Sequence, residues 1–455
     1  MKRKILLYGI SAALIFSACK KNLDQQSAVS ASSQSDAIAP NANYKPNEIL
    51  VKFKANIPDN QKNSVLANVQ GKISKYILSE AMKRYGDKQG LYVVHIPGNV
   101  EDAVKKLKGL AELVYAEPNF IYKHCAVSND PYFTSGQLWG MYGDQSTPKN
   151  QYGSQAAEAW AKGHVGVAKV VVGVIDEGAM FNHEDLVANY RANPFDKVDG
   201  IDNDGNGYID DVHGWDFFNG DNSTFDGTVD DHGTHVSGTL GATGGNGKGV
   251  AGVNWKVSIL NGKFLGPFGG SSEDAALAVD YMTDFKMRHH ANIVALNNSW
   301  GGGGFSQTLK DAIDRADSAN ILFVAAAGNN NSNNDAFPFY PATYTSENII
   351  SVAAITSVGL RSSFSDYGLT TVDLGAPGSG IYSTLPGANN TSTYGSYDGT
   401  SMATPHVTGA AALYASTHPG ATAAQIKAAI LSSVIATPSL SGKCVTGGRL
   451  NLSSF

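Results

Sequence analysis

The sequence has few charged residues, few cysteines and no zinc-protease motif. Asp, Glu, Lys and Arg make up only 16% of its 455 residues, and the formal net charge is -6. Proteins that bind nucleic acids usually carry a basic surface, so this composition argues against nucleic acid as a partner. His232 and His235 are spaced like metal ligands, but Gly233 stands where the HExxH pattern has its general-base Glu. We therefore expect no catalytic metal.

Glycine, by contrast, is abundant. The 50 glycines fit a fold with many turns between strands and loops. The last roughly 320 residues are enough for one large hydrophobic core.

A run of small residues near the C-terminus delivers one serine to the start of an apolar helix. The sequence GTSMATPHV occupies residues 399–407 and contains Ser401. Unpaired backbone N–H groups and the positive end of the helix dipole can stabilise negative charge that forms beside this hydroxyl. Ser401 is therefore a candidate nucleophile.

Two other segments supply what a nucleophilic serine needs. A serine hydroxyl requires a base within hydrogen-bond reach and a third group that orients the base. His232 lies in the sequence DHGTHV at 231–236, and Asp176 ends the apolar run VVGVID at 171–176. Such a run predicts a buried parallel strand, whose C-terminal edge is where sites form in α/β sheets.

The order Asp176, His232, Ser401 is that of subtilisin among the serine triads. These segments resemble the subtilisin-like (S8) serine protease family, over about residues 128–455. The resemblance implies an α/β fold with a doubly wound, mostly parallel sheet flanked by helices. It also implies that Asn329, after the apolar run at 321–327, donates to the oxyanion together with the Ser401 N–H.

In this family the substrate binds as an added strand between two backbone segments. The matching residues are Ser299, Trp300, Gly301 on one side, Gly269, Gly270, Ser271 on the other, and Ala327 and Gly328 beside the oxyanion donor. Glycines allow a second backbone to approach closely. Trp300 departs from the aliphatic residue typical of its position. We expect apolar or aromatic residues before the scissile bond, because these stretches and the expected pocket floor at 337–344 offer no carboxylate. Asp335, near that floor, is the one residue that could change this.

An acidic loop at residues 199–211 resembles the first half of an EF-hand calcium site. Oxygen-bearing groups fall at the ligand spacing, and His213 replaces the bidentate Glu at position 12. The predicted calcium ligands are Asp199, Asp202, Asp204, Asn206, the carbonyl of Tyr208, and Asp210, with Asp211 or water as further candidates. A solvated acidic turn is the alternative. The family resemblance suggests a second calcium site, with Asp185 and Asn246.

The N-terminus reads as an export signal. Lys2, Arg3 and Lys4 precede an apolar stretch at 5–16 that is too short to span a bilayer, so residues 1–18 are a predicted signal peptide. Small residues before Cys19 are typical of a bacterial lipoprotein, in which that cysteine carries the lipid. Simple secretion is the alternative.

Residues 19–45 are polar and predict a flexible tether. Strand patterns at 49–53, 91–96 and 113–120 and helix patterns at 60–69 and 100–110 then indicate a small ferredoxin-like α+β unit. This unit, at 46–125, resembles the inhibitory propeptide of the same family. An independent binding domain is the alternative.

The predicted catalytic domain spans 126–455, with its mature start between Tyr122 and Asp130. Whether Cys125 and Cys444 form a disulfide stays open. We expect Lys263 and the pair His289 and His290 to be ordinary solvated or capping groups.

The sequence thus predicts an exported serine endopeptidase, made as a self-processed precursor, that acts on proteins or peptides. It is held at a membrane by its lipid or else secreted. An acyl transferase on the same scaffold and a surface binding module are the rival functions.

Overall fold

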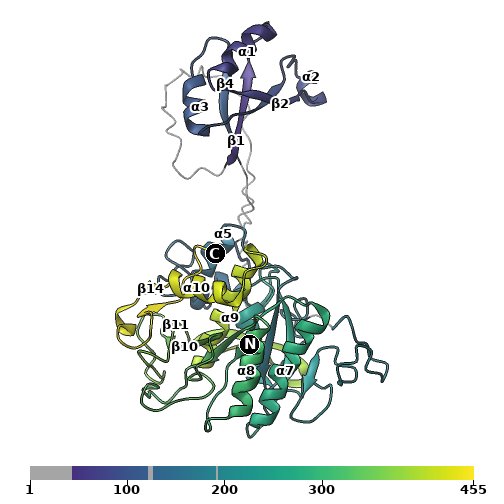
Figure 1. The fold of residues 1–455 in the computed structure, drawn as a ribbon, viewed down its shortest axis with the longest axis vertical. Helices are drawn as coiled ribbons and strands as arrows, with labels where there is room; N and C mark the ends of the chain where they lie inside the picture. Colours follow the sequence, from purple (N-terminus) through teal and green to yellow (C-terminus); the bar gives the residue numbers. More distant parts are fainter. Residues whose placement is uncertain (1–43, 121–126, 191–192) are drawn as a thin grey trace, which may run out of the picture. The chain divides into compact units, whose positions relative to one another are not determined.

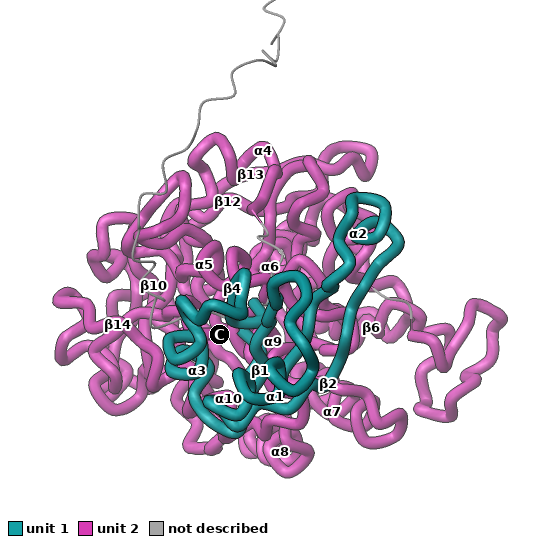
Figure 2. Tube along the Cα trace, turned by 90° about the horizontal axis from the view of Figure 1, so that it is seen from above, with its two compact units in different colours: residues 1–122 teal, residues 123–455 magenta. Residues whose placement is uncertain are grey.

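The computed structural model describes residues 44–120, 127–190 and 193–455. The chain divides into two compact units, residues 1–122 and 123–455, which Figure 2 shows in different colours.

The smaller unit is a four-stranded antiparallel sheet with helices. Its elements are β1 Tyr44–Phe53, α1 Asp59–Ala67, β2 Lys72–Ile77, α2 Glu80–Arg84, β3 Leu91–His95, α3 Val100–Leu107 and β4 Leu113–Phe120. The strand order β2-β3-β1-β4 is that of a ferredoxin-like unit, the class of fold expected for this segment. β1 begins at Tyr44, so ordered structure starts within the predicted tether.

Alternating burial explains why this unit folds as it does. Ile49, Val51 and Phe53 of β1 are all fully buried and point to one face. In α3 the buried positions 100, 103, 104 and 107 follow the helical period, and Asn99 caps the helix by accepting a hydrogen bond from the Asp102 N–H.

The larger unit is an α/β domain (Figure 1). Its strands are β5 Val171–Asp176, β6 Gly214–Asp216, β7 Ser258–Lys263, β8 Ile293–Asn298, β9 Leu322–Ala326, β10 Ile349–Ile355, β11 Leu374–Pro377, β12 Ile381–Pro386, β13 Ser392–Tyr397, β14 Ile435–Ala436 and β15 Gly448–Arg449. Its α-helices are α4 Pro131–Thr134, α5 Ala156–Ala161, α6 Asp231–Gly241, α7 Ser272–His289, α8 Gln307–Ser318, α9 Thr400–Thr417 and α10 Ala423–Ser433, with short 3₁₀ turns at Trp139–Met141, Ala388–Asn390 and Pro438–Leu440.

The main sheet has the order β14-β15-β11-β10-β9-β8-β5-β7-β6. Neighbours within it are parallel, except that β14 and β15 are antiparallel. From β5 the chain builds outward in both directions, so the C-terminal end of β5 is the topological switch point, where α/β folds bind their ligands. The doubly wound, mostly parallel sheet predicted from the sequence is confirmed.

Helices cover both faces of this sheet. In β9, Leu322 and Val324 pack into one buried cluster with residues of α6 and α9, whereas Phe323 and Ala325 pack into another with residues of α7 and α8. Figure 1 shows α7 and α8 side by side.

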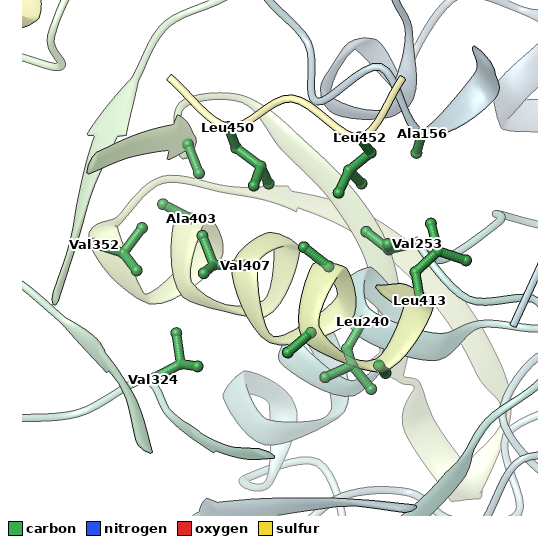
Figure 3. Packing of buried hydrophobic residues seen from close by; sticks show 14 of the residues in the cluster. Ala156, Leu240, Val253, Val324, Val352, Ala403, Val407, Leu413, Leu450 and Leu452 are labelled. Carbon is green, nitrogen blue, oxygen red and sulfur yellow. The ribbon is translucent and has the colours of Figure 1, made fainter. Parts of the chain in front are cut away.

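Helix α9, which carries Ser401, is packed into the larger cluster. Figure 3 shows Ala403 and Val407 of this helix on the side of Val324 and Val352 from the sheet, and Leu413 farther along the helix near Leu240 and Val253. These side chains are fully buried. The start of α9 is therefore held rigidly against the C-terminal ends of the strands.

Candidate active site

The structure brings Asp176 and His232 together at the switch point. Asp176 is the last residue of β5, and its side chain is 1% exposed. Its Oδ1 lies 2.9 Å from Nδ1 of His232, the second residue of α6. This contact fixes the ring and leaves the imidazole Nε2 for a reacting group.

Glu177 ties the strand to the helix. Its carboxylate accepts a hydrogen bond of 2.6 Å from the backbone N–H of His232, one of the donors that a helix start leaves unpaired. Burial alone lowers the pKa of His232, but the carboxylates of Asp176 and Glu177 outweigh it, and the pKa is raised. Burial, followed by the charge of Asp176, raises the pKa of Glu177.

Ser401 is held by a reciprocal contact with Ser299. Pro405 lies inside α9 and has no N–H to give to the carbonyl four residues earlier. The Ser299 hydroxyl donates to that Ser401 carbonyl instead, at 2.8 Å, and the Ser401 hydroxyl donates to the Ser299 carbonyl at 2.9 Å. Within the described residues, no hydrogen bond joins Ser401 to His232. In this structure the Ser401 hydroxyl is directed to the Ser299 carbonyl, and a contact between a nucleophile and its base often forms only with substrate.

Two donors face one point beside Gly399. The Asn329 Oδ1 accepts from the N–H and the hydroxyl of Thr400, which fixes the direction of its amide. A carbon added to Gly399 would lie 3.5 Å from the Ser401 nitrogen and 3.7 Å from Nδ2 of Asn329. The two nitrogens predicted as oxyanion donors therefore lie close to one point beside Gly399, as an oxyanion site requires.

The two predicted substrate-binding segments line one cavity. It measures about 250 Å³ and is bordered by residues 269–272 and 300–304, with aromatic rings from Phe264, Tyr340 and Tyr344. Trp300 is anchored by a hydrogen bond from its indole N–H to the Ile175 carbonyl. Ser271 caps α7 by accepting from the Asp274 N–H. Trp300 therefore forms part of the wall of the cavity, whereas the side chain of Ser271 caps helix α7.

A buried carboxylate near this site was missed by the sequence reasoning. Asp335, the acidic residue expected near the pocket floor, accepts hydrogen bonds from Leu369, Thr370 and Thr371. Asp366 is instead 1% exposed and lies against Gly328, and its Oδ2 has no hydrogen-bond partner among the described residues. No local pattern marks this position, because its neighbours come from distant parts of the chain.

The acidic loop is closed by its own carboxylates. Asp210 accepts from the N–H groups of residues 199 and 200, and the Asp199 carboxylate accepts from the N–H of residue 201. Asp202 and Asp204 both accept from the Asn206 N–H, so these two carboxylates lie close together. Over the described ranges, no three His, Cys, Asp or Glu side chains are grouped as a metal site.

Two further residues bear on the predicted calcium site. His213 stacks on the ring of Phe181, and Asp211 accepts a hydrogen bond from the side-chain amide of Asn206.

The second suggested metal site gathers three oxygen-bearing residues. The Asn246 amide donates to Asp185 at 2.8 Å, and Asp130, buried and not predicted, accepts from the N–H groups of residues 245–247.

The expectation that Lys263 is a solvated group is wrong. Its side chain is 3% exposed, and its ammonium lies 2.7 Å from Asp230 and 3.3 Å from Asp226. Burial lowers the pKa of Lys263, but these carboxylates outweigh it, and the pKa is raised. His289 is also largely buried, 3.0 Å from Asp204, whereas His290 ends α7 in a left-handed conformation.

Several predictions fall outside the described residues, namely the signal peptide, the lipid at Cys19 and the partner of any disulfide, Cys125. Cys444 is described and is buried. No helix in the described part of the chain is long and apolar enough to cross a membrane.

Comparison with known protein families identifies the family of this chain. The model of the subtilase family (Peptidase_S8) matches residues 168–448, more than half of the chain. The chain belongs to the subtilase family. A second model, the fervidolysin N-terminal prodomain, matches residues 30–119 of this subtilase.

Named relatives agree. The subtilase is 33% identical over 374 residues to a thermophilic serine proteinase of a Bacillus species, covering 82% of this chain and 79% of that protein. It is 39% identical over 303 residues to thermitase of Thermoactinomyces vulgaris, covering 66% and 89%. A solved protease structure from Pseudoalteromonas arctica matches with a TM-score of 0.55 at 29% identity, covering 72% and 98%. The subtilase is thus a subtilisin-like serine peptidase made with a prodomain.

Proposed function

We propose that this protein is an exported endopeptidase that hydrolyses peptide bonds through Ser401, His232 and Asp176. The observation that carries the proposal is the 2.9 Å contact between the buried Asp176 and the imidazole of His232, at the switch point of the sheet. Asp176 holds the ring with Nε2 free and stabilises the imidazolium that forms during the reaction.

The reaction proceeds through a covalent intermediate. The Ser401 Oγ bonds to the carbonyl carbon of the substrate while its proton moves to Nε2 of His232. The C–N bond then breaks, and His232 gives the proton to the leaving amine. A water molecule repeats the sequence on the ester, which releases the acid and restores Ser401.

The negative oxygen formed at each stage is stabilised beside Gly399. The Asn329 amide and the Ser401 N–H converge there, and both are fixed before the substrate arrives. Fixed donors need no reorganisation as charge develops, which is why such sites lower the barrier.

The substrate strand lies between residues 269–271 and 299–301, and one of its side chains enters the 250 Å³ cavity. The prodomain inhibits the enzyme until it is cut away between residues 122 and 130.

Calcium stabilises the loop at 199–211. Asp202, Asp204 and Asn206 fit a calcium ion in kind, since they are oxygen donors and two of these carboxylates share one N–H donor. A bound cation would neutralise their mutual repulsion.

Ser401→Ala in the full chain tests the catalytic proposal. We expect peptide hydrolysis to fall by about 10⁶-fold, a magnitude measured in another subtilisin, with the fold intact. The purified precursor should also remain uncut, which mass spectrometry would show. Ser318→Ala, at an exposed position of α8, is the matched control and should process itself normally. Processing of purified Ser401→Ala in isolation would contradict self-cleavage.

A further inference from the structure

The ring of Phe339 contacts two glycines, Gly301 and Gly328, that form the walls of a slot near Ser401. Gly301 lies two residues after Ser299, and Gly328 immediately precedes Asn329. A carbon added to Gly301 would lie 2.2 Å from Cε1 of Phe339, and one added to Gly328 would lie 3.2 Å from its Cδ1. Since real carbon atoms do not approach within 3.0 Å, the ring occupies the space over Gly301 and reaches across to Gly328.

The backbone around Phe339 holds the ring in place. The Phe339 carbonyl accepts hydrogen bonds from the N–H and the hydroxyl of Thr343. The next carbonyl, that of Tyr340, accepts from the Gly302 N–H at 2.8 Å, which ties the segment to the wall itself. Pro338 and Pro341 restrict the backbone on both sides. The ring is partly buried and packs in the same cluster as Trp300.

Under the proposed mechanism, this slot receives the residue immediately before the scissile bond, because the carbonyl of that residue is the one held by Asn329 and Ser401. Its side chain starts one bond away and therefore lies against Gly328 and Gly301, the neighbours of those two contacts. A long side chain entering there would meet the Phe339 ring.

We propose that Phe339 fills this pocket and restricts the residue before the scissile bond to Gly, Ala or Ser. The inference deepens the proposed function and rests on it. It replaces the expectation of an apolar or aromatic residue at that place. Lys and Arg are excluded for the same steric reason, although the Asp366 carboxylate lies against Gly328.

The kinetic test uses peptides that differ only in the residue before the cut: Ala, Leu, Phe or Lys. The mature wild-type enzyme should prefer Ala to Phe by at least tenfold in kcat/KM, and Phe339→Ala should raise kcat/KM for the Leu and Phe peptides by tenfold or more. These expected ratios follow from the roughly 10- to 200-fold loss of kcat/KM that one misfitting methylene causes in an apolar pocket. Phe339→Leu should be intermediate.

Phe305→Ala is the matched control. Its ring packs on Tyr340 and Tyr344 and is 56% exposed, so this variant should keep the wild-type profile. Fastest cleavage after Phe or Tyr by the wild type, or an unchanged profile in active Phe339→Ala, would overturn the inference.

A binding measurement separates this inference from the catalytic proposal. Labelled tetrapeptides that end in Ala or Phe are products and bind without being cut, so fluorescence anisotropy reports the pocket alone. The mature wild type should bind the Ala-ended peptide at least tenfold more tightly, and Phe339→Ala should lose that preference. This result would support the pocket assignment even if Ser401→Ala proved active, and equal binding of both peptides by the wild type would refute it.

Discussion

Glu177 couples the strand that carries Asp176 to the helix that carries His232. Its carboxylate caps the helix at the His232 N–H, and its charge adds to that of Asp176 beside the imidazole. One side chain therefore positions the base and also tunes it. The two tasks are separable, because Gln accepts the same hydrogen bond without the charge.

Glu177→Gln should shift the acid limb of the pH profile to lower pH. Activity needs neutral His232, and a raised pKa keeps the ring protonated until the pH is higher. Glu177 is ionised only above its own pKa of about 7, and His232 becomes neutral around its pKa of about 9. Removing the Glu177 charge should therefore raise kcat/KM roughly two- to tenfold between about pH 7 and 9 and leave the alkaline plateau level. The measurement is kcat/KM against pH on one peptide.

Glu347→Gln, at an exposed site, controls for the change in net charge. If both variants keep the wild-type acid limb, Glu177 acts only as a helix cap.

Local sequence patterns indicated the candidate reacting residues but not their surroundings. Asp176 ends a buried apolar run, and Ser401 begins an apolar helix, so short segments disclosed both. Lys263 ends β7, and nothing near it in sequence shows that Asp226 and Asp230 will bury it. Phe339 was placed only within a pocket floor, because its contacts with Gly301 and Gly328 depend on two distant loops.

At the scale of elements, burial decides which ones the sequence could predict. Strand β3 was predicted because its sequence contains the apolar residues Val93 and Val94, which are buried in the structure. β2, at the edge of the same sheet, was missed because five of its six residues are exposed and it shows no alternation. α2 has no buried residue and was missed for the same reason.

The loop at 199–211 is an element without regular structure, held by carboxylates that accept backbone N–H groups. Asp202→Ala with Asp204→Ala should lower the melting temperature and abolish its response to calcium. An ion bound only by the folded state at about 100 times its Kd contributes about 2.7 kcal/mol, which is about 4 °C for a domain of roughly 330 residues, given an unfolding entropy of about 2.1 cal/mol/K per residue. Thermal melts of the mature enzyme in chelator and in millimolar calcium measure both effects.

The double variant Asp144→Ala with Asp311→Ala removes the same charge from exposed positions and should still respond to calcium. A wild-type melting temperature that is equal in chelator and in calcium would show that the loop is simply solvated.

At the scale of the whole molecule, the chain order separates the lipid from the catalytic machinery. Each unit has its own buried cluster, and the proposed triad lies entirely in the unit at 123–455. The predicted lipid at Cys19 and the predicted cut at 122–130 place the anchor on the prodomain side. We therefore propose that lipid holds the precursor and that processing frees the catalytic unit.

Fractionation of cells that export the protein tests this order of events. Full-length Ser401→Ala, which stays uncut, should partition with the membrane, because acyl chains give stable binding where no described helix can span the bilayer. Ser401→Ala with Cys19→Ser should move to the soluble fraction, whereas Ser401→Ala with Cys125→Ser should remain on the membrane and so control for loss of a thiol. The wild-type catalytic unit should be soluble, with an N-terminus between residues 122 and 130 by mass spectrometry. Membrane retention of the Cys19→Ser form would rule out the lipid as anchor, and retention of the processed wild-type unit would show that the anchor outlasts maturation.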